Sequence, residues 1–285
     1  MLSIQQTELT LKGLKIKVME RRNNTSHHSP LLNVMITAAY KAARGLVKDF
    51  GEIEHLQVSR KGPGEFVSAS DINSEKTLCY ELSKARPNYG FLLEESGVIP
   101  GEDTEHTWII DPLDGTTNFL HGVPHFAISI GLKKKNEIVA GVIYDPIKDE
   151  MFVAEKGRGA FMNDRRLRVS GRKEFPNCLL GTGVTMANPQ YHRAFLNSIE
   201  KVLPVSAGLR RMGAASLDLA YVAAGRLDGY WEYTLKPWDV AAGIVLVREA
   251  GGVITQIDGK PKEADEGTVL AGNPFVQEQL LKILR

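Results

Sequence analysis

The stretch WIIDPLDGTTN, which runs from Trp108 to Asn118, decides the interpretation of this chain. It begins as an apolar run typical of a buried strand and ends in two carboxylates three residues apart. Because Pro112 cannot donate to a strand ladder, we predict that the strand stops at Asp111. Gly115 permits a turn, and either of the two threonines after it can cap a helix whose first N–H groups stay free. Two hard oxygen ligands beside a helix start indicate a site for Mg²⁺ and phosphate.

A lone Asp-Pro-x-Asp-Gly segment would predict only an ordinary turn. The motif indicates a metal site because other acidic residues occur in matching positions. Glu94 and Glu95 follow an apolar strand, Asp71 precedes a helix, and Asp239 stands where another helix begins. Each alone is typical of a surface loop or a helix cap. Together with the two aspartates of the motif, they lie where α/β proteins gather ligand residues. Such a cluster needs cations, and oxygen ligands without His or Cys favour Mg²⁺, Mn²⁺ or Ca²⁺ over zinc.

Composition narrows the class of protein further. The chain has 285 residues, 43% of them hydrophobic, which suffices for a sizeable core. A net charge of +1 gives no indication that the protein binds nucleic acid. Cys79 and Cys178 have no CxxC partner, so we expect no zinc or redox site and take the reduced cytoplasm as the compartment. No apolar run approaches the length of a membrane span.

The chain divides into a leader and one catalytic unit. Residues 1–29 lack a signal-peptide core; we expect a disordered leader, with a weak basic amphipathic helix as the alternative. Residues 30–285 are expected to form a single unit of two packed halves. Strands cluster over about 30–160, which indicates an α+β half, and alternate with helices over about 161–285, which indicates an α/β half.

The hydrophobic periodicity and the turn signals predict the individual elements. Helices are expected at residues 31–50, 72–85, 191–202, 215–224, 240–250 and 277–284, the second of them capped by Ser70 or Asp71. Strands are expected at 89–93, 126–132, 138–144, 151–155, 160–162, 179–180, 227–231, 253–254 and 269–270, with a hairpin over 55–69 that turns at 61–64.

Several separate segments resemble signatures of the inositol monophosphatase family. Residues 108–118 are similar to its pattern W-x-[IV]-D-P-[IL]-D-G-T-x-N, and residues 238–252 resemble its second signature. Residues 94–96 match the Glu-Glu segment of the family, and residues 68–75 match its T-x-x-D-x-x-x-E region. The segments occur in the family's order, and the resemblance runs from about Leu31 to the end, so residues 1–29 fall outside it.

The resemblance implies a fold and an activity. The fold would be the layered αβαβα sugar-phosphatase fold, an α/β protein with an α+β N-terminal half, usually a homodimer. The activity would be hydrolysis of phosphate monoesters with two to three Mg²⁺ ions, sensitive to lithium. The family substrate would be inositol monophosphate or a similar small polyol phosphate.

The resemblance also assigns roles to residues by their motif positions. Glu94, Asp111 and the Leu113 carbonyl would hold one metal ion, and Asp111, Asp114 and Asp239 a second. Glu94 and Asp71 would support a third, weaker site. Thr116 would orient the attacking water with Asp71 nearby, which makes Thr116, Asp71 and Glu94 the catalytic set. The N–H groups of Gly115 and Thr116 would bind phosphate, and the sugar would face Glu232, Gly213, Ala214 and Ala215.

Two alternatives stay open at this stage. The substrate can instead be fructose 1,6-bisphosphate, NADP or 3′-phosphoadenosine 5′-phosphate, which relatives in the same superfamily hydrolyse. An acidic Glu232 argues for a polyol, since it accepts hydroxyl hydrogen bonds and repels a second phosphate, although Arg210 and Arg211 weaken that argument if they point inward. The other alternative is a non-catalytic role in which the protein acts on the transcription machinery. Bacterial relatives include proteins of this kind.

Overall fold

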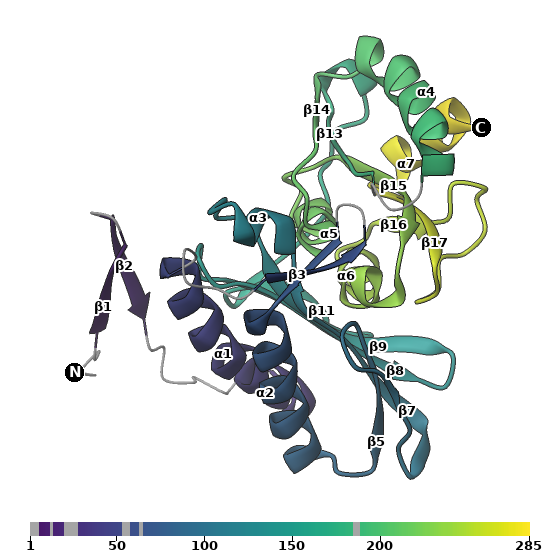
Figure 1. Cartoon of the computed structure of the whole chain (residues 1–285). Coiled ribbons are helices and arrows are strands. Elements are labelled where there is room, and N and C mark those ends of the chain that lie inside the picture. The colour runs from purple at the N-terminus through teal and green to yellow at the C-terminus, as the bar shows by residue number, and fades with distance from the viewer. Residues whose placement is uncertain (1–5, 12–13, 20–27, 53–57, 63–64, 185–188) are drawn as a thin grey trace.

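The computed structural model describes residues 6–11, 14–19, 28–52, 58–62, 65–184 and 189–285. For residues 6–11, 14–19, 60–62 and 65–66 it describes the backbone only. The elements stack as helix, sheet, helix, sheet and helix layers, as Figure 1 shows. The expected layered αβαβα fold is therefore confirmed.

The first two layers are a helix pair and a large sheet. Helices α1 (Pro30–Gly51) and α2 (Ala69–Ala85) pack together on one face of an eight-stranded sheet. Its strand order is β12-β11-β10-β9-β8-β7-β5-β6, and only β5 and β7 run parallel to each other. The strands are β5 (Tyr89–Leu93), β6 (Gly97–Ile99), β7 (Asp103–Asp114), β8 (Ala127–Lys134), β9 (Glu137–Asp145), β10 (Glu150–Glu155), β11 (Gly159–Met162) and β12 (Arg165–Arg166).

Helix α1 illustrates how the sequence directs an element. Ser29 caps it by accepting the Leu32 N–H at 3.1 Å, and Pro30 occupies the first turn, where its missing N–H costs nothing. The apolar residues spaced by three and four then form one buried stripe against the sheet. This helix matches the one expected at 31–50.

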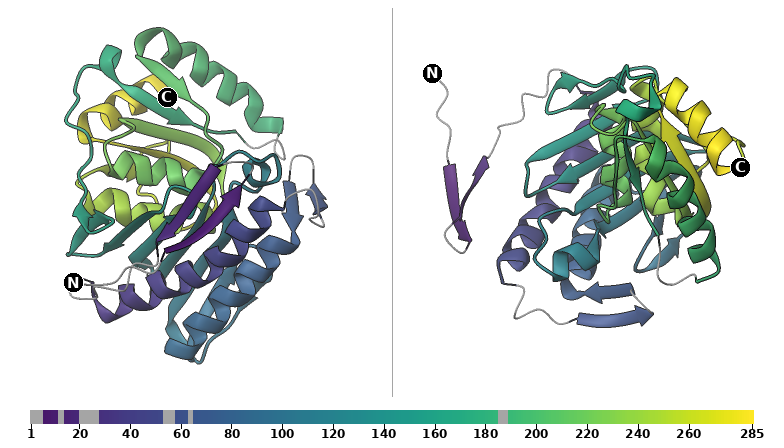
Figure 2. Two further views of the ribbon diagram at one scale, coloured as in Figure 1. Left: turned by 90° about the vertical axis from the view of Figure 1, so that its left-hand side faces the viewer. Right: turned by 90° about the horizontal axis from the view of Figure 1, so that it is seen from above.

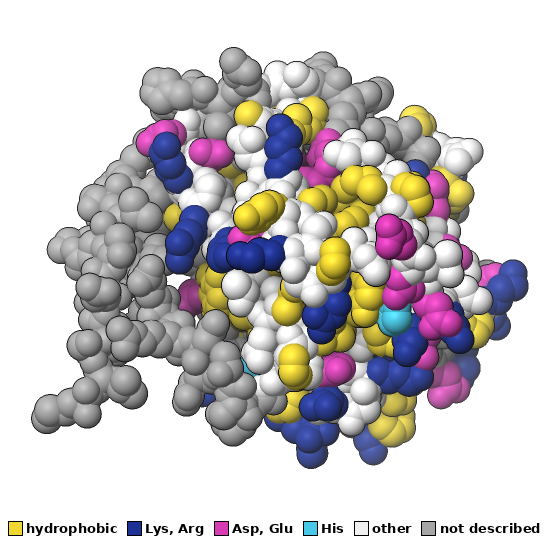
Figure 3. Space-filling view, turned by 90° about the horizontal axis from the view of Figure 1, so that it is seen from below, with side chains coloured by type: hydrophobic (Ala, Val, Ile, Leu, Met, Phe, Trp, Pro, Cys, Tyr) yellow, Lys and Arg dark blue, Asp and Glu magenta, His cyan; other side chains and the backbone are white. Residues whose placement is uncertain are grey.

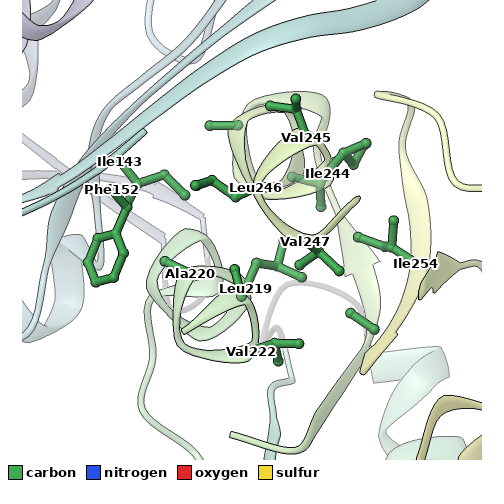
Figure 4. Close-up of a cluster of buried hydrophobic side chains, with 14 of the residues drawn as sticks. Ile143, Phe152, Leu219, Ala220, Val222, Ile244, Val245, Leu246, Val247 and Ile254 are labelled. Carbon is green, nitrogen blue, oxygen red and sulfur yellow. The ribbon is translucent and has the colours of Figure 1, made fainter. Parts of the chain in front are cut away.

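The middle layer consists of α5 (Ala215–Ala223) and α6 (Pro237–Glu249), which lie between the two sheets. Every residue of α5 is buried, and its apolar side chains meet those of α6, β9 and β10 in the central core (Figure 4). Gly131 and Gly141 pair across β8 and β9 directly beneath α6. A Cβ on Gly131 would lie 2.7 Å from the Ala241 Cβ, so helix and sheet approach more closely than any side chain would permit.

The last two layers are a smaller sheet and a second helix pair. The sheet has the order β14-β13-β15-β17-β16, in which β13 runs parallel to both of its neighbours. Helices α4 (His192–Val202) and α7 (Pro274–Leu284) contact each other, and α7 packs on this sheet. The strands are β13 (Leu179–Thr182), β14 (Gly208–Arg210), β15 (Gly229–Leu235), β16 (Val253–Thr255) and β17 (Gly267–Gly272).

The short elements complete the chain. Helix α3 (Thr116–Leu120) follows β7, and the hairpin of β3 (Val58–Gly62) and β4 (Glu65–Ser68) precedes α2, as expected for 55–69. Single 3-10 turns are formed by Phe175–Asn177, Pro189–Tyr191 and Leu203–Val205. Among the helices in the described ranges, none is both long and apolar enough to cross a membrane.

The N-terminal segment is described only in part, and the expectation of a leader over residues 1–29 stays a prediction. Where it is described, β1 (Gln6–Leu11) and β2 (Leu14–Met19) pair as an antiparallel ribbon. Figures 1 and 2 show this ribbon beside the layered body. The division at residue 30, and the split of the remaining chain near residue 160, stay predictions.

Several predicted boundaries shift by a few residues for local reasons. Helix α2 begins at Ala69, because Ser68 and not Ser70 or Asp71 is its cap. Helices α6 and α7 begin at prolines rather than at 240 and 277, and Asn273 caps α7 by accepting two backbone N–H groups. Strand β15 begins at Gly229 instead of Leu227.

Charges of both signs are distributed over the surface. On the face seen in Figure 3, acidic and basic side chains alternate with apolar ones, and no patch of one sign dominates. This agrees with the net charge of +1.

Candidate active site

The end of β7 carries the two aspartates of the first motif. Contrary to the prediction, the strand does not stop at Asp111 but continues to Asp114, with an irregular register against β8 between the two. The missing N–H of Pro112 falls within this irregularity, which is where a strand tolerates proline. Asp111 Oδ1 accepts the Leu113 N–H at 2.9 Å, which stabilises the bent backbone.

Gly115, and not a threonine, stands at the cap position of α3. Its φ of +91° lies in the left-handed region, and no side chain caps the helix. The hydroxyl of Thr116 is instead within donor range of the Leu113 carbonyl, at 3.0 Å, and of Asp71 Oδ1, at 3.2 Å. The threonine therefore links the first motif to α2.

Asp71 is held rigidly for this contact. It occupies the third position of α2, where its Oδ2 accepts the Ser68 N–H at 2.8 Å and the Ser68 hydroxyl at 2.6 Å. The side chain is fully buried, and burial raises the pKa of the carboxyl group above its usual value although these hydrogen bonds lower it. One oxygen thus fixes the carboxylate while the other faces Thr116.

Asp114 and Asp239 are oriented by the middle helices. Asp114 Oδ2 accepts the Ser216 N–H at 2.8 Å and the Ser216 hydroxyl at 2.5 Å, at the start of α5. Asp239 stands in the first turn of α6, where its Oδ2 accepts the Lys236 N–H at 2.7 Å. The starts of the two middle helices therefore fix both aspartates in place.

Four carboxylates from three segments interact at this point. Burial raises the pKa of Asp111 far above its usual value, and the negative charges of Glu94, Asp114 and Asp239 raise it further. Burial also raises the pKa of Asp239, with contributions from Asp114 and Glu94, and raises that of Asp114 to about 6. The fold thus brings together the four acidic side chains that the sequence predicted as metal ligands, from β7, α6 and the turn after β5.

The chemistry of this donor set fits hard cations. Within the described ranges, no three His, Cys, Asp or Glu side chains are already arranged around one point that could hold an ion. Carboxylates that are buried together at such an electrostatic cost are typical of sites that bind Mg²⁺ or a similar ion through oxygen.

The candidate substrate residues surround the same carboxylates. Glu232 lies on β15 and accepts a hydrogen bond from the Tyr230 hydroxyl. Burial raises the pKa of Glu232 to about 7, and the charge of Glu232 in turn raises the pKa of Asp239, so the two groups are neighbours. A Cβ on Gly183 would overlap the Glu232 carboxylate, which explains the glycine at the end of β13.

Residues 213–215 lie against the first motif. Asn118 Nδ2 donates to the Met212 carbonyl and to the His125 carbonyl, both at 2.8 Å. A Cβ on Gly115 would lie 3.3 Å from the Ala214 Cβ. Gly213, Ala214 and Ala215 thus adjoin the turn that is predicted to bind phosphate, as the sequence assignment requires.

Sequence reasoning missed three residues that shape this site. Ser216 fixes Asp114, and Tyr230 donates to Glu232, as described above. Asp218 is buried on α5 and, in the described part of the chain, its Oδ1 has no hydrogen-bond partner. Burial and then the charge of Glu232 raise its pKa. The only available signal was an acid or a hydroxyl inside an otherwise apolar helix or strand, which is too common to single out.

The raised pKa values predict a pH-dependent stability. The native Asp114 carboxyl holds its proton up to about pH 6, against 3.8 in the unfolded chain. Its contribution to stability is therefore complete below the lower value and is lost as the pH rises through the higher one. Mg²⁺ requires the deprotonated carboxylates, so its stabilising effect should grow over the same range.

Thermal unfolding with and without Mg²⁺ measures this effect. At about a hundred times the Kd, bound Mg²⁺ stabilises by about 2.7 kcal/mol, which corresponds to a rise in Tm of roughly 5–10 °C. We expect this rise at about pH 7.5 and a much smaller one at about pH 5. An equal rise at both pH values would mean that these carboxylates do not bind the ion.

The comparisons with known proteins agree with this geometry. Residues 27–285 match the model of the inositol monophosphatase family. An inositol-1-monophosphatase of Mesorhizobium japonicum is 54% identical over 90% of this chain and 97% of its own. The Nus factor SuhB of Pseudomonas aeruginosa is 43% identical over 90% and 96%. The crystal structure of the extragenic suppressor protein suhB from Bartonella henselae superposes with a TM-score of 0.87 at 52% identity, over 90% and 99%.

Fold, site and comparisons together define the class of protein. The layered fold and the family match are those of a phosphatase of the sugar-phosphatase type. The chain belongs to the inositol monophosphatase family.

Proposed function

We propose that this protein is a Mg²⁺-dependent phosphatase of inositol monophosphate or a similar small polyol phosphate. The observation that carries the proposal is the set of interacting carboxylates at the end of β7, whose pKa values are raised by burial and by one another. Two inositol-1-monophosphatases at 51–54% identity over nine tenths of the chain support the same substrate.

Different residues of the chain would hold the different metal ions. Glu94, Asp111 and the Leu113 carbonyl would hold one ion, and Asp111, Asp114 and Asp239 a second. Glu94 and Asp71 would contribute to a third. When bound, Mg²⁺ supplies charge neutralisation for the phosphate and acidifies water. The proposal of two to three ions is supported by the number of oxygen donors that these segments offer.

Thr116 and Asp71 would orient the attacking water and accept its proton. The Thr116 hydroxyl lies 3.2 Å from Asp71 Oδ1, and Asp71 is held by Ser68 through its other oxygen. A water bound to Thr116 could pass a proton toward this carboxylate as it attacks phosphorus. The Gly115 and Thr116 N–H groups would bind the phosphate oxygens. Because phosphoryl transfer mainly requires positioning and charge neutralisation, no covalent nucleophile is needed.

The biological setting is proposed from the same resemblance. We expect a homodimer in the cytoplasm and inhibition by Li⁺. Relatives named Nus factor SuhB, 41–43% identical over nine tenths of the chain, support a second role in transcription. A variant without activity that still performs that role in cells would separate it from catalysis.

A panel of phosphate monoesters tests the proposed substrate. With Mg²⁺ present, we expect the highest kcat/KM for inositol monophosphate among inositol monophosphate, fructose 1,6-bisphosphate, NADP and 3′-phosphoadenosine 5′-phosphate. The physical reason is Glu232, which accepts hydrogen bonds from hydroxyl groups and repels a second phosphate. The positive charge of Arg211, which lowers the pKa of Glu232, weakens this repulsion. A preference for one of the other three would overturn the polyol assignment while leaving the phosphatase assignment intact.

Replacing Glu232 tests the leaving-group contact directly. Glu232→Ala leaves substrate hydroxyls unpaired, at a cost of about 1–3 kcal/mol, so we expect a roughly ten- to hundredfold loss in kcat/KM for inositol monophosphate. Glu232→Gln keeps one acceptor and should cost little. A simple aryl phosphate, which lacks those hydroxyls, serves as the control substrate and should be much less affected. Equal losses on both substrates would place Glu232 in the metal chemistry instead.

A further inference from the structure

One face of α2 carries three polar groups that the described chemistry uses only in part. Asp71, Ser74 and Glu75 lie at helical spacings of three and four, so they share one side of the first two turns. All three are almost fully buried, with at most 3% of their surface exposed. Asp71 has a proposed role through its contact with Thr116. Ser74 and Glu75, in contrast, belong to neither the proposed metal ligands nor the substrate contacts.

Each of these groups holds a different segment of the site. The Ser74 hydroxyl donates to the Pro112 carbonyl at 2.8 Å, within the irregular end of β7. Glu75 Oε2 accepts the Glu95 N–H at 2.9 Å, and its Oε1 accepts the Ser96 hydroxyl at 2.5 Å. The first two turns of α2 therefore contact two of the three segments that carry the candidate ligands, namely the end of β7 and the turn after β5.

The turn bound by Glu75 carries the candidate ligand Glu94. Residues 94–96 join β5 to β6, the last and shortest strand at this edge of the sheet. Glu94 and Glu95 are half-buried and Ser96 is exposed. Toward the interior of the sheet, the Glu94 N–H donates to the carbonyl of Ile110 on the neighbouring strand β7 at 3.2 Å. Glu75 then fixes the next two residues, so the backbone of Glu94 is held from both directions.

Glu75 makes these contacts without a compensating cation. In the described part of the chain, its two oxygens meet only neutral donors, and no ion pair involves it. A buried acidic side chain is costly unless its polar atoms are hydrogen-bonded, and both oxygens of Glu75 accept a hydrogen bond from the turn. A group of this kind is better suited to fixing a ligand segment than to general packing, for which an apolar side chain would serve.

We propose that Glu75 is a positioning residue that sets the metal affinity of the site by fixing the turn that carries Glu94, with Ser74 playing the matching part for the end of β7. This inference rests on the proposed function. Hydrogen bonds that hold a ligand-bearing segment in place orient the ligands before the ion binds. Loss of such a bond typically lowers metal affinity by about 10–100-fold. Because Glu75 touches neither ion nor substrate, its loss should spare the chemical step once the site is filled.

Magnesium titrations of the metal-stripped protein test the proposal. Isothermal titration calorimetry gives the Kd for Mg²⁺, and phosphate release gives the half-activating Mg²⁺ concentration and the kcat at saturation. For Glu75→Ala we expect both concentrations to rise by about 10–100-fold, with kcat at saturating Mg²⁺ within about threefold of the wild type. Glu75→Gln keeps one acceptor and should recover part of the affinity.

Two further variants separate positioning from folding. Ser96→Ala removes one of the two contacts from the turn and should weaken Mg²⁺ binding in the same direction by a smaller factor, even if Glu75→Ala fails to fold. Thr77→Ala is the control on the same helix, because among the described residues its hydroxyl donates to the Asn73 carbonyl of α2 and not to a candidate ligand segment. A lower Tm with unchanged Mg²⁺ affinity in Glu75→Gln and Ser96→Ala would overturn the proposal and leave Glu75 a structural residue.

The two proposals fail in different ways. A wild-type protein that binds Mg²⁺ but releases no phosphate would contradict the proposed function, and the calorimetric comparison would still decide the role of Glu75. A wild-type enzyme activated by Mg²⁺, together with Glu75 variants of equal affinity, would contradict this inference alone. If the wild type binds no Mg²⁺, both are overturned.

Discussion

Asp111→Asn is expected to lower phosphate release by about a thousandfold or more, because a shared ligand of two metal ions supplies several kcal/mol of transition-state stabilisation. The metal-free variant should nevertheless be as stable as the wild type or more so. The reason is the raised pKa of Asp111, which reflects burial and the repulsion of Glu94, Asp114 and Asp239. A neutral amide relieves both costs.

Two measurements on one protein preparation check this prediction. Tm without metal reports the relief of repulsion, and the rise in Tm with Mg²⁺ should be smaller than in the wild type. Glu102→Gln, the same chemical change at an exposed position just before β7, is the control and should change neither quantity. A large fall in Tm of the metal-free Asp111→Asn protein would instead identify Asp111 as a structural carboxylate.

Gly141→Val is expected to be the most destabilising substitution in the sheet. A Cβ on Gly141 would lie 2.7 Å from the Ala242 carbonyl oxygen and 2.8 Å from the Val245 Cγ1. The helix cannot give way easily, because Gly243 on its other side packs against Leu219 of α5, where a Cβ would come within 2.4 Å of a side-chain carbon. Overpacking of this kind costs about 3 kcal/mol or more, which lowers Tm by roughly 6–12 °C.

Thermal unfolding of Gly141→Val beside Gly171→Val measures this cost. Gly171 is exposed, and a Cβ placed there would meet no atom within 4 Å beyond its own chain neighbours, so its substitution should change Tm little. Because α6 carries Asp239 in its first turn, the soluble fraction of Gly141→Val should also bind Mg²⁺ more weakly. Equal Tm values for the two variants would show that α6 does not depend on the close approach.

The elements of this fold were largely predictable because their signals are local. The stripe in α1, the mainly buried runs of β8 and β9, and the motif at the end of β7 each depend on residues near in sequence. The errors are local too. Pro112 was expected to end the strand, but the irregular register between Asp111 and Asp114 accommodates its missing N–H and turns both carboxylates toward the site.

Contacts across long sequence separations could not be predicted. Ser216 lies 102 residues from Asp114, and the bond from Ser74 to the Pro112 carbonyl spans 38 residues. Nothing in the sequence near Asp218 indicates that its carboxylate lies beside Glu232. The family resemblance named the ligands, whereas the groups that orient them depend on how α2, α5 and α6 pack, which only the structure reveals.

The most direct test of the account is phosphate release from inositol 1-phosphate by protein stripped with a chelator. The oxygen-only donor set predicts no release above the uncatalysed rate until Mg²⁺ is restored, and full recovery afterwards. The same titration on Asp111→Asn should recover almost nothing. Full phosphate release from the stripped wild-type protein, without added metal, would contradict the claim that Glu94, Asp111, Asp114 and Asp239 act by binding Mg²⁺.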